Sequence, residues 1–266
     1  MHLESRKTFL MDLFLVLVVC FFACITRSNL WVMTGVVGMC WLFRLGWAWW
    51  RSPVERRLLD VSLLVVATLV GGFNDFNTVV LHGVYRYTVE VFSPATGGIP
   101  LWMLLFWGLI MRFAASFSWT VAGDVKIGGS KNPALRIAFL LSLVIATRLS
   151  IFRLYLDPVW SWMPFALATA LYFVVLQPGR STYLLFFLIA TFGTAGEALL
   201  IQVAGLHEYH LPMFGGVPLW ITLWWSLAIL IWQELAAQLL EYAGALAHNR
   251  RESLEKAPNL PEMSVP

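Results

Sequence analysis

The chain has 266 residues, of which 59% are hydrophobic, 15% aromatic and 12% charged, whereas soluble domains are about 45–50% apolar and about 25% charged. This composition excludes a soluble enzyme, a disordered chain and a fibrous repeat. A formal net charge of +3 is too small to indicate nucleic acid as a partner. The mean hydropathy of +0.75 predicts an all-α polytopic protein, which we expect in the bacterial inner membrane among membrane lipid.

Eight apolar segments predict about eight transmembrane helices, since a helix needs about 20 apolar residues to cross a bilayer. In chain order they cover residues 9–26, 30–49, 58–81, 98–121, 133–151, 159–176, 182–203 and 217–243. Arg6 and Lys7 precede the first segment as in a signal peptide, but no small-x-small cleavage site follows, so we expect this segment to be retained. The polar segment 248–266 contains three prolines and is expected to be a disordered cytoplasmic tail.

Lysine and arginine indicate the orientation, because cytoplasmic loops carry an excess of them. With the N-terminus inside, the cytoplasmic segments hold twelve: Arg6, Lys7, Arg51, Arg56, Arg57, Lys126, Lys131, Arg136, Arg180, Arg250, Arg251 and Lys256. The opposite side holds four: Arg27, Arg86, Arg148 and Arg153. Both termini are therefore predicted to be cytoplasmic. Arg44 and Arg112 lie within or near the ends of spans, where they either snorkel or pair with Asp12, Asp60 or Glu234.

An internal repeat divides the chain. The sequence GGIPLW at 97–102 recurs as GGVPLW at 215–220, and Trp107 matches Trp225 at the same offset of 118. At an offset of 122, residues 83–87 match 205–209 and Asp75 matches Glu197. We expect two four-helix repeats, 1–128 and 129–247, before the tail. Since an even number of helices separates the copies, they insert with the same polarity, as a parallel repeat about an axis along the membrane normal.

Asp75 and Glu197 are the principal catalytic candidates. Both lie inside apolar spans, where an ionisable group is costly and usually functional, and a buried carboxyl group that keeps its proton is suited to general acid catalysis. We expect both to face one cavity, with the carboxyl groups within about 10 Å of each other. The structural alternative is an intramembrane hydrogen bond to Asn74, Asn77 or Gln202.

Aromatic side chains follow both acids. Tyr85, Tyr87, His207 and Tyr209 are expected to orient the acids or to relay protons, although tyrosine also belongs to the aromatic belt at a membrane surface. The substrate-binding candidates are two asparagines and a set of tryptophans whose ring faces stabilise a cation: Asn74, Asn77, Trp102, Trp107, Trp220, Trp224 and Trp225. Cys20, Cys24 and Cys40 lie in apolar segments without metal-ligand spacing, so we expect neither a metal nor a cofactor.

The acid, the Gly-x-x-x-Tyr stretch and the Gly-(Ile/Val)-Pro-Leu-Trp turn together resemble a segment of the integral-membrane carotenoid biosynthesis family, the bacterioruberin-type carotenoid hydratases. In the second copy the matching positions are Glu197, Gly205, His207, Tyr209, Gly216, Val217, Pro218, Leu219 and Trp225. In the first copy they are Asp75, Gly83, Tyr85, Tyr87, Gly98, Pro100, Leu101 and Trp107. The resemblance covers residues 70–110 and 190–228. Histidine at 207 and aspartate at 75 depart from the family pattern, which leaves the substrate open.

More loosely, two acids on separate helices resemble the integral-membrane terpene cyclases and the membrane lysoplasmalogenases. The resemblance implies an enzyme that acts on a lipid-soluble isoprenoid or carotenoid, by hydration or cyclisation through a protonated alkene or epoxide. The alternatives are a vinyl-ether hydrolase, a proton-coupled transporter of a small or lipidic solute, and a scaffold subunit. The apolar runs 63–69 and 184–191 disfavour a continuous polar path across the membrane. The oligomeric state and the division of acid and base roles stay open.

Overall fold

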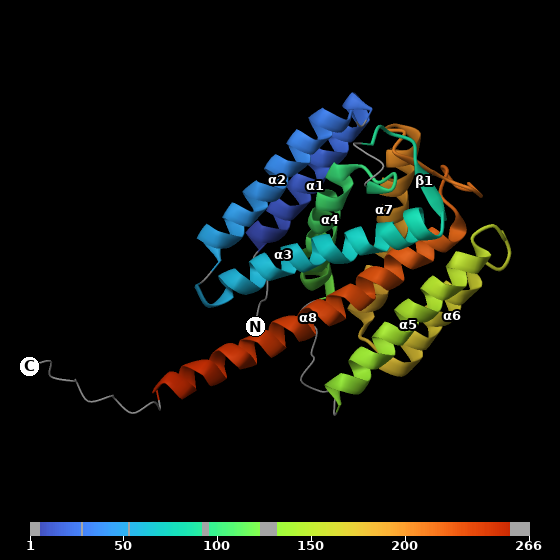
Figure 1. The fold of residues 1–266 in the computed structure, drawn as a ribbon. Helices are drawn as coiled ribbons and strands as arrows, with labels where there is room; N and C mark the ends of the chain where they lie inside the picture. The colour runs from blue at the N-terminus through green and yellow to red at the C-terminus, as the bar shows by residue number, and fades with distance from the viewer. Residues whose placement is uncertain (1–5, 28, 53, 92–95, 123–131, 256–266) are drawn as a thin grey trace, which may run out of the picture.

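The computed structural model describes residues 6–27, 29–52, 54–91, 96–122 and 132–255, and this part of the chain is mostly helical (Figure 1). Seven of its helices are long and apolar enough to cross a membrane, which confirms the predicted helical class. The helices are α1 (Arg6–Thr26), α2 (Leu30–Arg51), α3 (Val54–Asp75), α4 (Leu101–Ala122), α5 (Pro133–Leu154), α6 (Met163–Leu176), α7 (Arg180–Gln202) and α8 (Leu219–Glu255).

Two helices differ from the prediction in length. Helix α6 has only 14 residues, because the Asp157 carboxylate accepts hydrogen bonds from the backbone amides of Val159 and Trp160 and holds the preceding segment in a turn. Helix α8 continues to Glu255, so residues 248–255, predicted to be disordered, are helical. Residues 256–266 and the predicted boundary between the repeats, at 128 and 129, lie outside the described residues.

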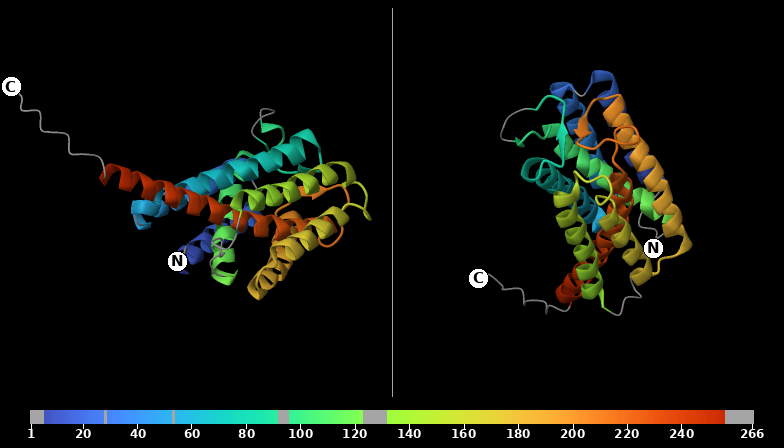
Figure 2. Two further views of the ribbon diagram at one scale, coloured as in Figure 1. Left: turned by 90° about the horizontal axis from the view of Figure 1, so that it is seen from below. Right: turned by 90° about the vertical axis from the view of Figure 1, so that its right-hand side faces the viewer.

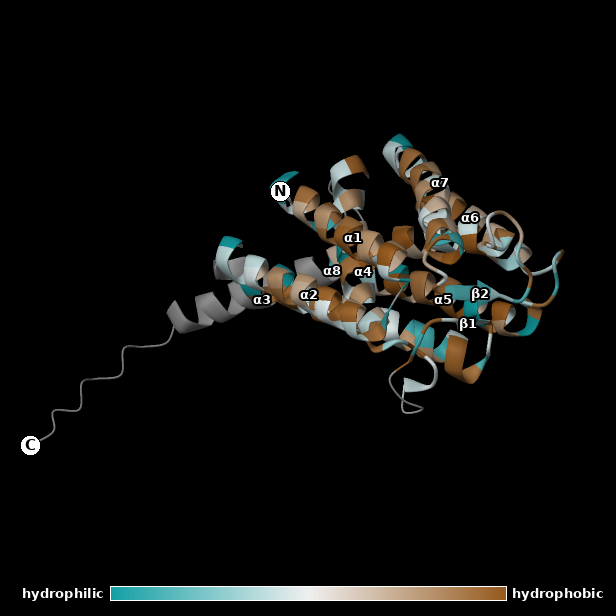
Figure 3. Ribbon diagram, turned by 90° about the horizontal axis from the view of Figure 1, so that it is seen from above, coloured by the Kyte–Doolittle hydropathy of each residue, from teal (hydrophilic) through white to brown (hydrophobic). Residues whose placement is uncertain are grey.

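Helices α4 and α8 form the centre of the bundle. Helix α4 packs against α1, α2 and α3, helix α8 packs against α6 and α7, and the two central helices also contact each other (Figure 2). Most residues of the long helices are hydrophobic, as the brown ribbon segments in Figure 3 show. Many large apolar side chains point outward, and Phe14, Trp31, Phe73 and Phe187 are each at least 60% exposed. Exposed apolar surface on this scale suits lipid rather than water.

Short elements outside the long α-helices were not predicted. A π-helical turn, η1 (Phe76–Leu81), extends α3 directly after Asp75. Strands β1 (Tyr85–Tyr87) and β2 (His207–Tyr209) pair antiparallel, with Arg86 opposite Glu208 at the centre of the register. The strands lie at the end of the bundle away from the start of α1 and the end of α8 (Figures 1 and 3).

The glycines of the recurring motifs make the turns on either side of these strands possible. All six described glycines with positive φ belong to those motifs, and their φ angles agree between the copies: Gly83 and Gly205 at 59° and 60°, Gly97 and Gly215 at 62° and 60°, Gly98 and Gly216 at 90° and 88°. This left-handed region is open to glycine at little cost. The glycines in the sequence repeat therefore encode the same backbone path in each copy.

Buried ion pairs stabilise the end of the bundle far from the strands. Arg44 donates from Nε to Asp12 Oδ1 at 2.6 Å and from Nη2 to Asp60 Oδ1 at 3.0 Å. Arg112 also contacts both carboxylates, at 3.4 and 3.2 Å. Glu234 pairs instead with Arg136, whose Nη2 lies 2.5 Å from its Oε2. The arginines of the cluster are thus paired rather than snorkelling.

A matched pair of glycines offers a test of the helix packing. A methyl group added at Gly71 would lie 2.3 Å from Trp107 Cβ, whereas at the equivalent Gly193 it would lie 3.5 Å from Trp225 Cβ. We expect Gly71→Ala to force α3 and α4 apart and to lower the free energy of unfolding by about 1–3 kcal/mol, the usual range for overpacking. Gly193→Ala should have little effect. Thermal unfolding in detergent measures both, and equal unfolding temperatures would contradict this packing.

Candidate functional site

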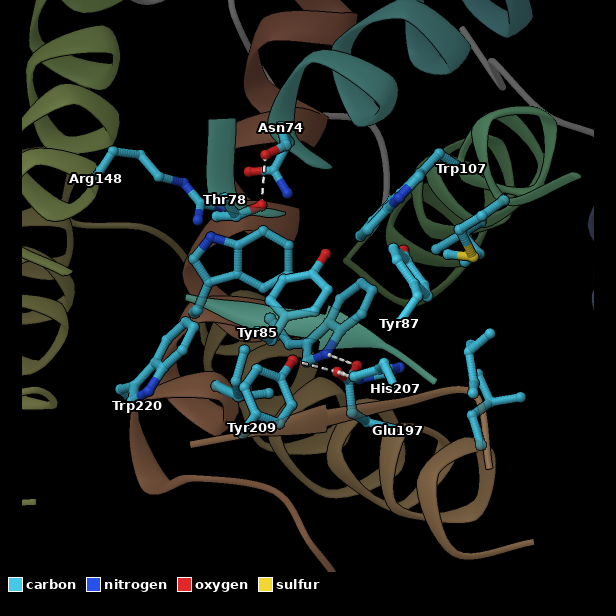
Figure 4. Close-up of a pocket in the computed structure, with 17 residues that line it drawn as sticks. Asn74, Thr78, Tyr85, Tyr87, Trp107, Arg148, Glu197, His207, Tyr209 and Trp220 are labelled. Atoms are coloured by element: carbon cyan, nitrogen blue, oxygen red, sulfur yellow. Dashed lines mark hydrogen bonds and ion pairs between the residues drawn. The ribbon is translucent and has the colours of Figure 1, made fainter. Parts of the chain in front are cut away.

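A pocket of about 50 Å³ lies where α3 and α7 end and α4 and α8 begin, beneath the two strands (Figure 4). Seven tyrosine and tryptophan rings form much of its wall, with a few polar groups among them. Its lining residues are Asn74, Thr78, Tyr85, Tyr87, Met103, Trp107, Ile110, Arg148, Glu197, Leu200, Leu206, His207, Tyr209, Trp220, Ile221, Trp224 and Trp225. Pockets for complete drug-sized ligands measure about 300–1,000 Å³. This pocket therefore has room for ordered water or for one end of a longer molecule.

Glu197 lines the pocket and accepts three hydrogen bonds. Tyr209 Oη donates to its Oε1 at 2.5 Å, His207 Nε2 lies 3.0 Å from the same oxygen, and Trp225 Nε1 donates to Oε2 at 2.8 Å. The carboxyl group is thereby fixed in orientation by β2 on one side and α8 on the other. His207 Nδ1 has no hydrogen-bond partner among the described residues, although it is buried.

Asp75 is fully buried and stands behind the pocket wall rather than in it. Its two oxygens accept hydrogen bonds from two tyrosines of β1: Tyr85 Oη at 2.6 Å and Tyr87 Oη at 2.5 Å. Both tyrosines line the pocket. A group in the pocket would therefore meet Asp75 through these hydroxyls.

The residues around the two acids make matching contacts. Thr88 Oγ1 donates to the Gly205 carbonyl at 2.6 Å, and His210 Nε2 lies 2.8 Å from the Gly83 carbonyl. The turns after α3 and α7 are closed by equivalent backbone hydrogen bonds. Val84 N donates to the Thr78 carbonyl at 2.8 Å, and Leu206 N donates to the Leu200 carbonyl at 3.0 Å. In the strand pairing, Tyr85 lies opposite Tyr209 and Tyr87 opposite His207. All of these positions correspond at the sequence offset of 122.

The strand tyrosines have strongly perturbed hydroxyls. Burial, and next the charge of Asp75, raise the pKa of Tyr85 and of Tyr87 well above the usual value of about 10. Burial and the neighbouring Glu197 do the same for the pKa of Tyr209. At neutral pH all three hydroxyls therefore keep their protons and act as hydrogen-bond donors to the acids.

Indole rings from both copies meet across the pocket. Trp107 and Trp225 stack with their ring centroids 5.7 Å apart and their planes 24° apart. Trp224 packs edge-on against both, at 6.3 and 5.0 Å. Tyr209 packs edge-on against Trp220 at 5.8 Å. Such a wall presents several π faces to whatever occupies the pocket, and π faces attract cations.

Most of the sequence-predicted site residues come together here, and three do not line the pocket. Asp75 lies behind its tyrosines, Asn77 donates from Nδ2 to the Phe73 carbonyl at 2.8 Å within its own helix, and Trp102 is buried against Phe106 with its ring centroid 6.2 Å away. Thr78 and Arg148 line the pocket but were not predicted as site residues, and Arg148 was counted only as a charge on the outer side. An arginine inside the apolar segment 133–151 was the available signal.

Within the part of the chain that the structure describes, no three His, Cys, Asp or Glu side chains gather closely enough to hold a metal ion. The three cysteines do not line the pocket. Cys40 is buried, and Cys20 and Cys24 are half-buried on α1. Comparisons with protein-family models, with curated proteins and with solved structures find no match for this chain. The resemblance to the carotenoid hydratases therefore stays a prediction.

The two stacked tryptophans differ in one hydrogen bond, which allows a matched test. Trp225 Nε1 donates to Glu197 Oε2 at 2.8 Å, whereas the Nε1 of the equivalent Trp107 interacts with Asp75 but has no acceptor within hydrogen-bond distance among the described residues. A hydrogen bond to a charged group contributes about 1.5–3 kcal/mol. We expect Trp225→Phe to lower turnover by about 10- to 100-fold and Trp107→Phe to lower it less, as measured by product formation. Equal losses would show that the Trp225 hydrogen bond has no special role.

Proposed function

We propose that the chain spans the membrane as two parallel four-helix repeats related by a pseudo-twofold axis that passes between β1 and β2. The matching contacts of the strands support this arrangement, because a twofold axis requires a self-complementary interface in which each contact occurs twice. The excess of lysine and arginine on one side supports an orientation with both termini in the cytoplasm. The strands and the pocket then lie toward the opposite face, together with Arg86 and His207.

We propose further that the protein is a membrane-embedded acid–base enzyme that acts on an isoprenoid or carotenoid lipid. The observation that carries this proposal is the pair of buried carboxyl groups, each held by hydroxyl or ring N–H donors, around one aromatic pocket. Buried acids that exchange protons with hydrogen-bonded partners are suited to general acid–base catalysis. Tryptophan faces suit the cation that alkene protonation creates.

In this mechanism the reacting end of the lipid enters the pocket and the remaining chain stays in the bilayer, as the small pocket volume requires. One carboxyl group transfers its proton to an alkene carbon, and the π electrons of the double bond form the new C–H bond. The cation is then either attacked by water, whose surplus proton passes to the second carboxylate, or loses a carbon-bound proton to that carboxylate and forms a new double bond. Glu197 acts directly from the pocket wall, whereas Asp75 acts through Tyr85 or Tyr87, whose hydroxyl passes one proton on as it receives another.

A transporter has less support. Between the pocket and the buried ion pairs, α3 consists of the apolar segment from Leu63 to Leu69. The one hydroxyl in this segment belongs to Thr68, which donates to the Leu64 carbonyl and accepts a hydrogen bond from Trp41. Such a segment offers no chain of exchangeable protons. A vinyl-ether hydrolase would use the same acids and differs only in the substrate.

The proposal is tested by expressing the protein in a host that makes isoprenoid lipids and by comparing the lipid extracts by mass spectrometry. The active protein should yield a product heavier by one water, or an isomer of unchanged mass with a new retention time. A variant with both Glu197→Gln and Asp75→Asn is the control. Unchanged isoprenoids, with proton flux into proteoliposomes that depends on the same acids, would favour the transporter instead.

A further inference from the structure

Arg148 is the one arginine that lines the pocket, and among the described residues its charge faces an aromatic ring but is paired with no carboxylate. It lies in the last third of α5, and its side chain reaches into the pocket from that helix (Figure 4). Its Cζ lies 4.7 Å from the centroid of the Trp224 ring. Within the part of the chain that the structure describes, the guanidinium makes neither a hydrogen bond nor an ion pair. An arginine left in this state inside an apolar helix is costly.

The other arginines buried in the bundle are neutralised. Arg44 contacts Asp12 and Asp60, and Arg136 contacts Glu234. Among the residues that the structure places, carboxylates pair with these arginines and none lies within bonding distance of Arg148. Arg148 is half-buried and lines the pocket.

The surroundings of Arg148 define a polar end of the pocket. Asn74 and Thr78 lie on its side of the pocket, and Glu197 and His207 lie on the other, with aromatic rings between them (Figure 4). The Thr78 hydroxyl is already committed to the Asn74 carbonyl at 2.6 Å. The guanidinium, with its five N–H donors, is thus the principal open donor at this end.

We propose that Arg148 binds a carboxylate at one end of an otherwise apolar substrate and so places a neighbouring double bond against Glu197. This inference rests on the proposed function and narrows its substrate to an isoprenoid acid. A guanidinium matches a carboxylate in both charge and bidentate geometry. Phosphate esters carry more negative charge, and no second lysine or arginine lines the pocket to balance it. A single carboxylate also fits the small volume at this end.

The test compares two retinoids with the same apolar chain and different head groups, retinoic acid and retinol. Saturable binding to the full-length protein in lipid nanodiscs is followed at pH 8.5 by energy transfer from tryptophan. The protein should bind the acid about 10- to 100-fold more tightly than the alcohol, as expected for charge-assisted hydrogen bonds. Arg148→Gln should remove this preference. Arg153→Gln, an exposed position on the same helix, should preserve it.

Equal affinity of the two retinoids for the unaltered protein, or no saturable binding of either, would overturn the proposal. So would a preference that survives Arg148→Gln, or tighter binding of farnesyl diphosphate than of the acid. The thermal unfolding temperature of Arg148→Gln distinguishes a binding role from a purely structural one. If Arg148 serves binding, the unfolding temperature should stay unchanged or rise. A clear fall would show that Arg148 serves to balance the charges of Asp75 and Glu197. Binding is measured without turnover, so this inference can fail while the acid–base proposal holds.

Discussion

Replacement of Glu197 by glutamine is expected to abolish most product formation and to leave the protein folded in the membrane. General acid–base catalysis contributes about 10²–10⁴ in rate, and the loss should approach the upper figure because a pocket lined mainly by aromatic rings offers few other proton donors. Glutamine keeps the size of the side chain but cannot exchange a proton. Its amide also has only one acceptor oxygen, whereas the carboxylate accepts from Trp225 Nε1 at one oxygen and from the Tyr209 hydroxyl at the other.

The control for Glu197→Gln is the same substitution at Glu208, which lies on the exposed face of β2 and pairs with Arg86 outside the pocket. Turnover is measured by mass spectrometry of the isoprenoid product, and folding by gel filtration and thermal unfolding. Asp75→Asn is also expected to be inactive, since Asp75 receives its proton through Tyr85 or Tyr87. Near-normal turnover in both acid variants would make the acids structural.

Replacement of Arg44 by methionine is expected to cost about 3–5 kcal/mol of stability, the range seen when one partner of a buried ion pair is removed. Arg44 is fully buried, and its guanidinium contacts both Asp12 and Asp60. Without it, Arg112 alone faces two carboxylates in the interior of the bundle. Thermal unfolding in detergent measures the loss.

A second substitution separates charge from packing in this cluster. Adding Asp12→Asn to Arg44→Met leaves one aspartate and one arginine, so the cluster is neutral again and part of the lost stability should return. Arg153→Met, at an exposed position, should change the unfolding temperature little. If the double variant is no more stable than Arg44→Met, the arginine contributes through its packing rather than its charge.

The helices were largely predictable because their apolar runs are long and uninterrupted. The boundaries of α2 and α7 agree with the prediction within a few residues, since Gly179 and Asn29 mark their starts and charged or polar residues their ends. Helix α6 was predicted too long, because hydropathy cannot register the turn that the Asp157 side chain forms. The strands escaped prediction because three residues carry too little pattern, and their pairing joins positions 122 residues apart.

The site was predictable where an ionisable side chain lies in an apolar segment. An acid in an apolar span stands out, and the repeat placed a tyrosine at the same distance from each acid. The sequence does not reveal that β1 and β2 bring those tyrosines onto the carboxyl oxygens, or that the shorter side chain of Asp75 withdraws it from the pocket wall. Arg148 meets the same criterion as the acids, an ionisable group in an apolar span, although the sequence prediction counted it only as an outer charge. That no described carboxylate pairs with it depends on the three-dimensional arrangement of α5.

Isotope incorporation tests the central claim most directly. The purified protein in nanodiscs is supplied with an isoprenoid lipid in D₂O, and the product is analysed by mass spectrometry after exchangeable deuterium has been washed out with H₂O. If an enzymatic acid protonates an alkene, the product should carry one deuterium bound to carbon. The Glu197→Gln variant should not form this deuterated product. A product without carbon-bound deuterium, or no product from the unaltered protein, would contradict the proposed acid–base mechanism.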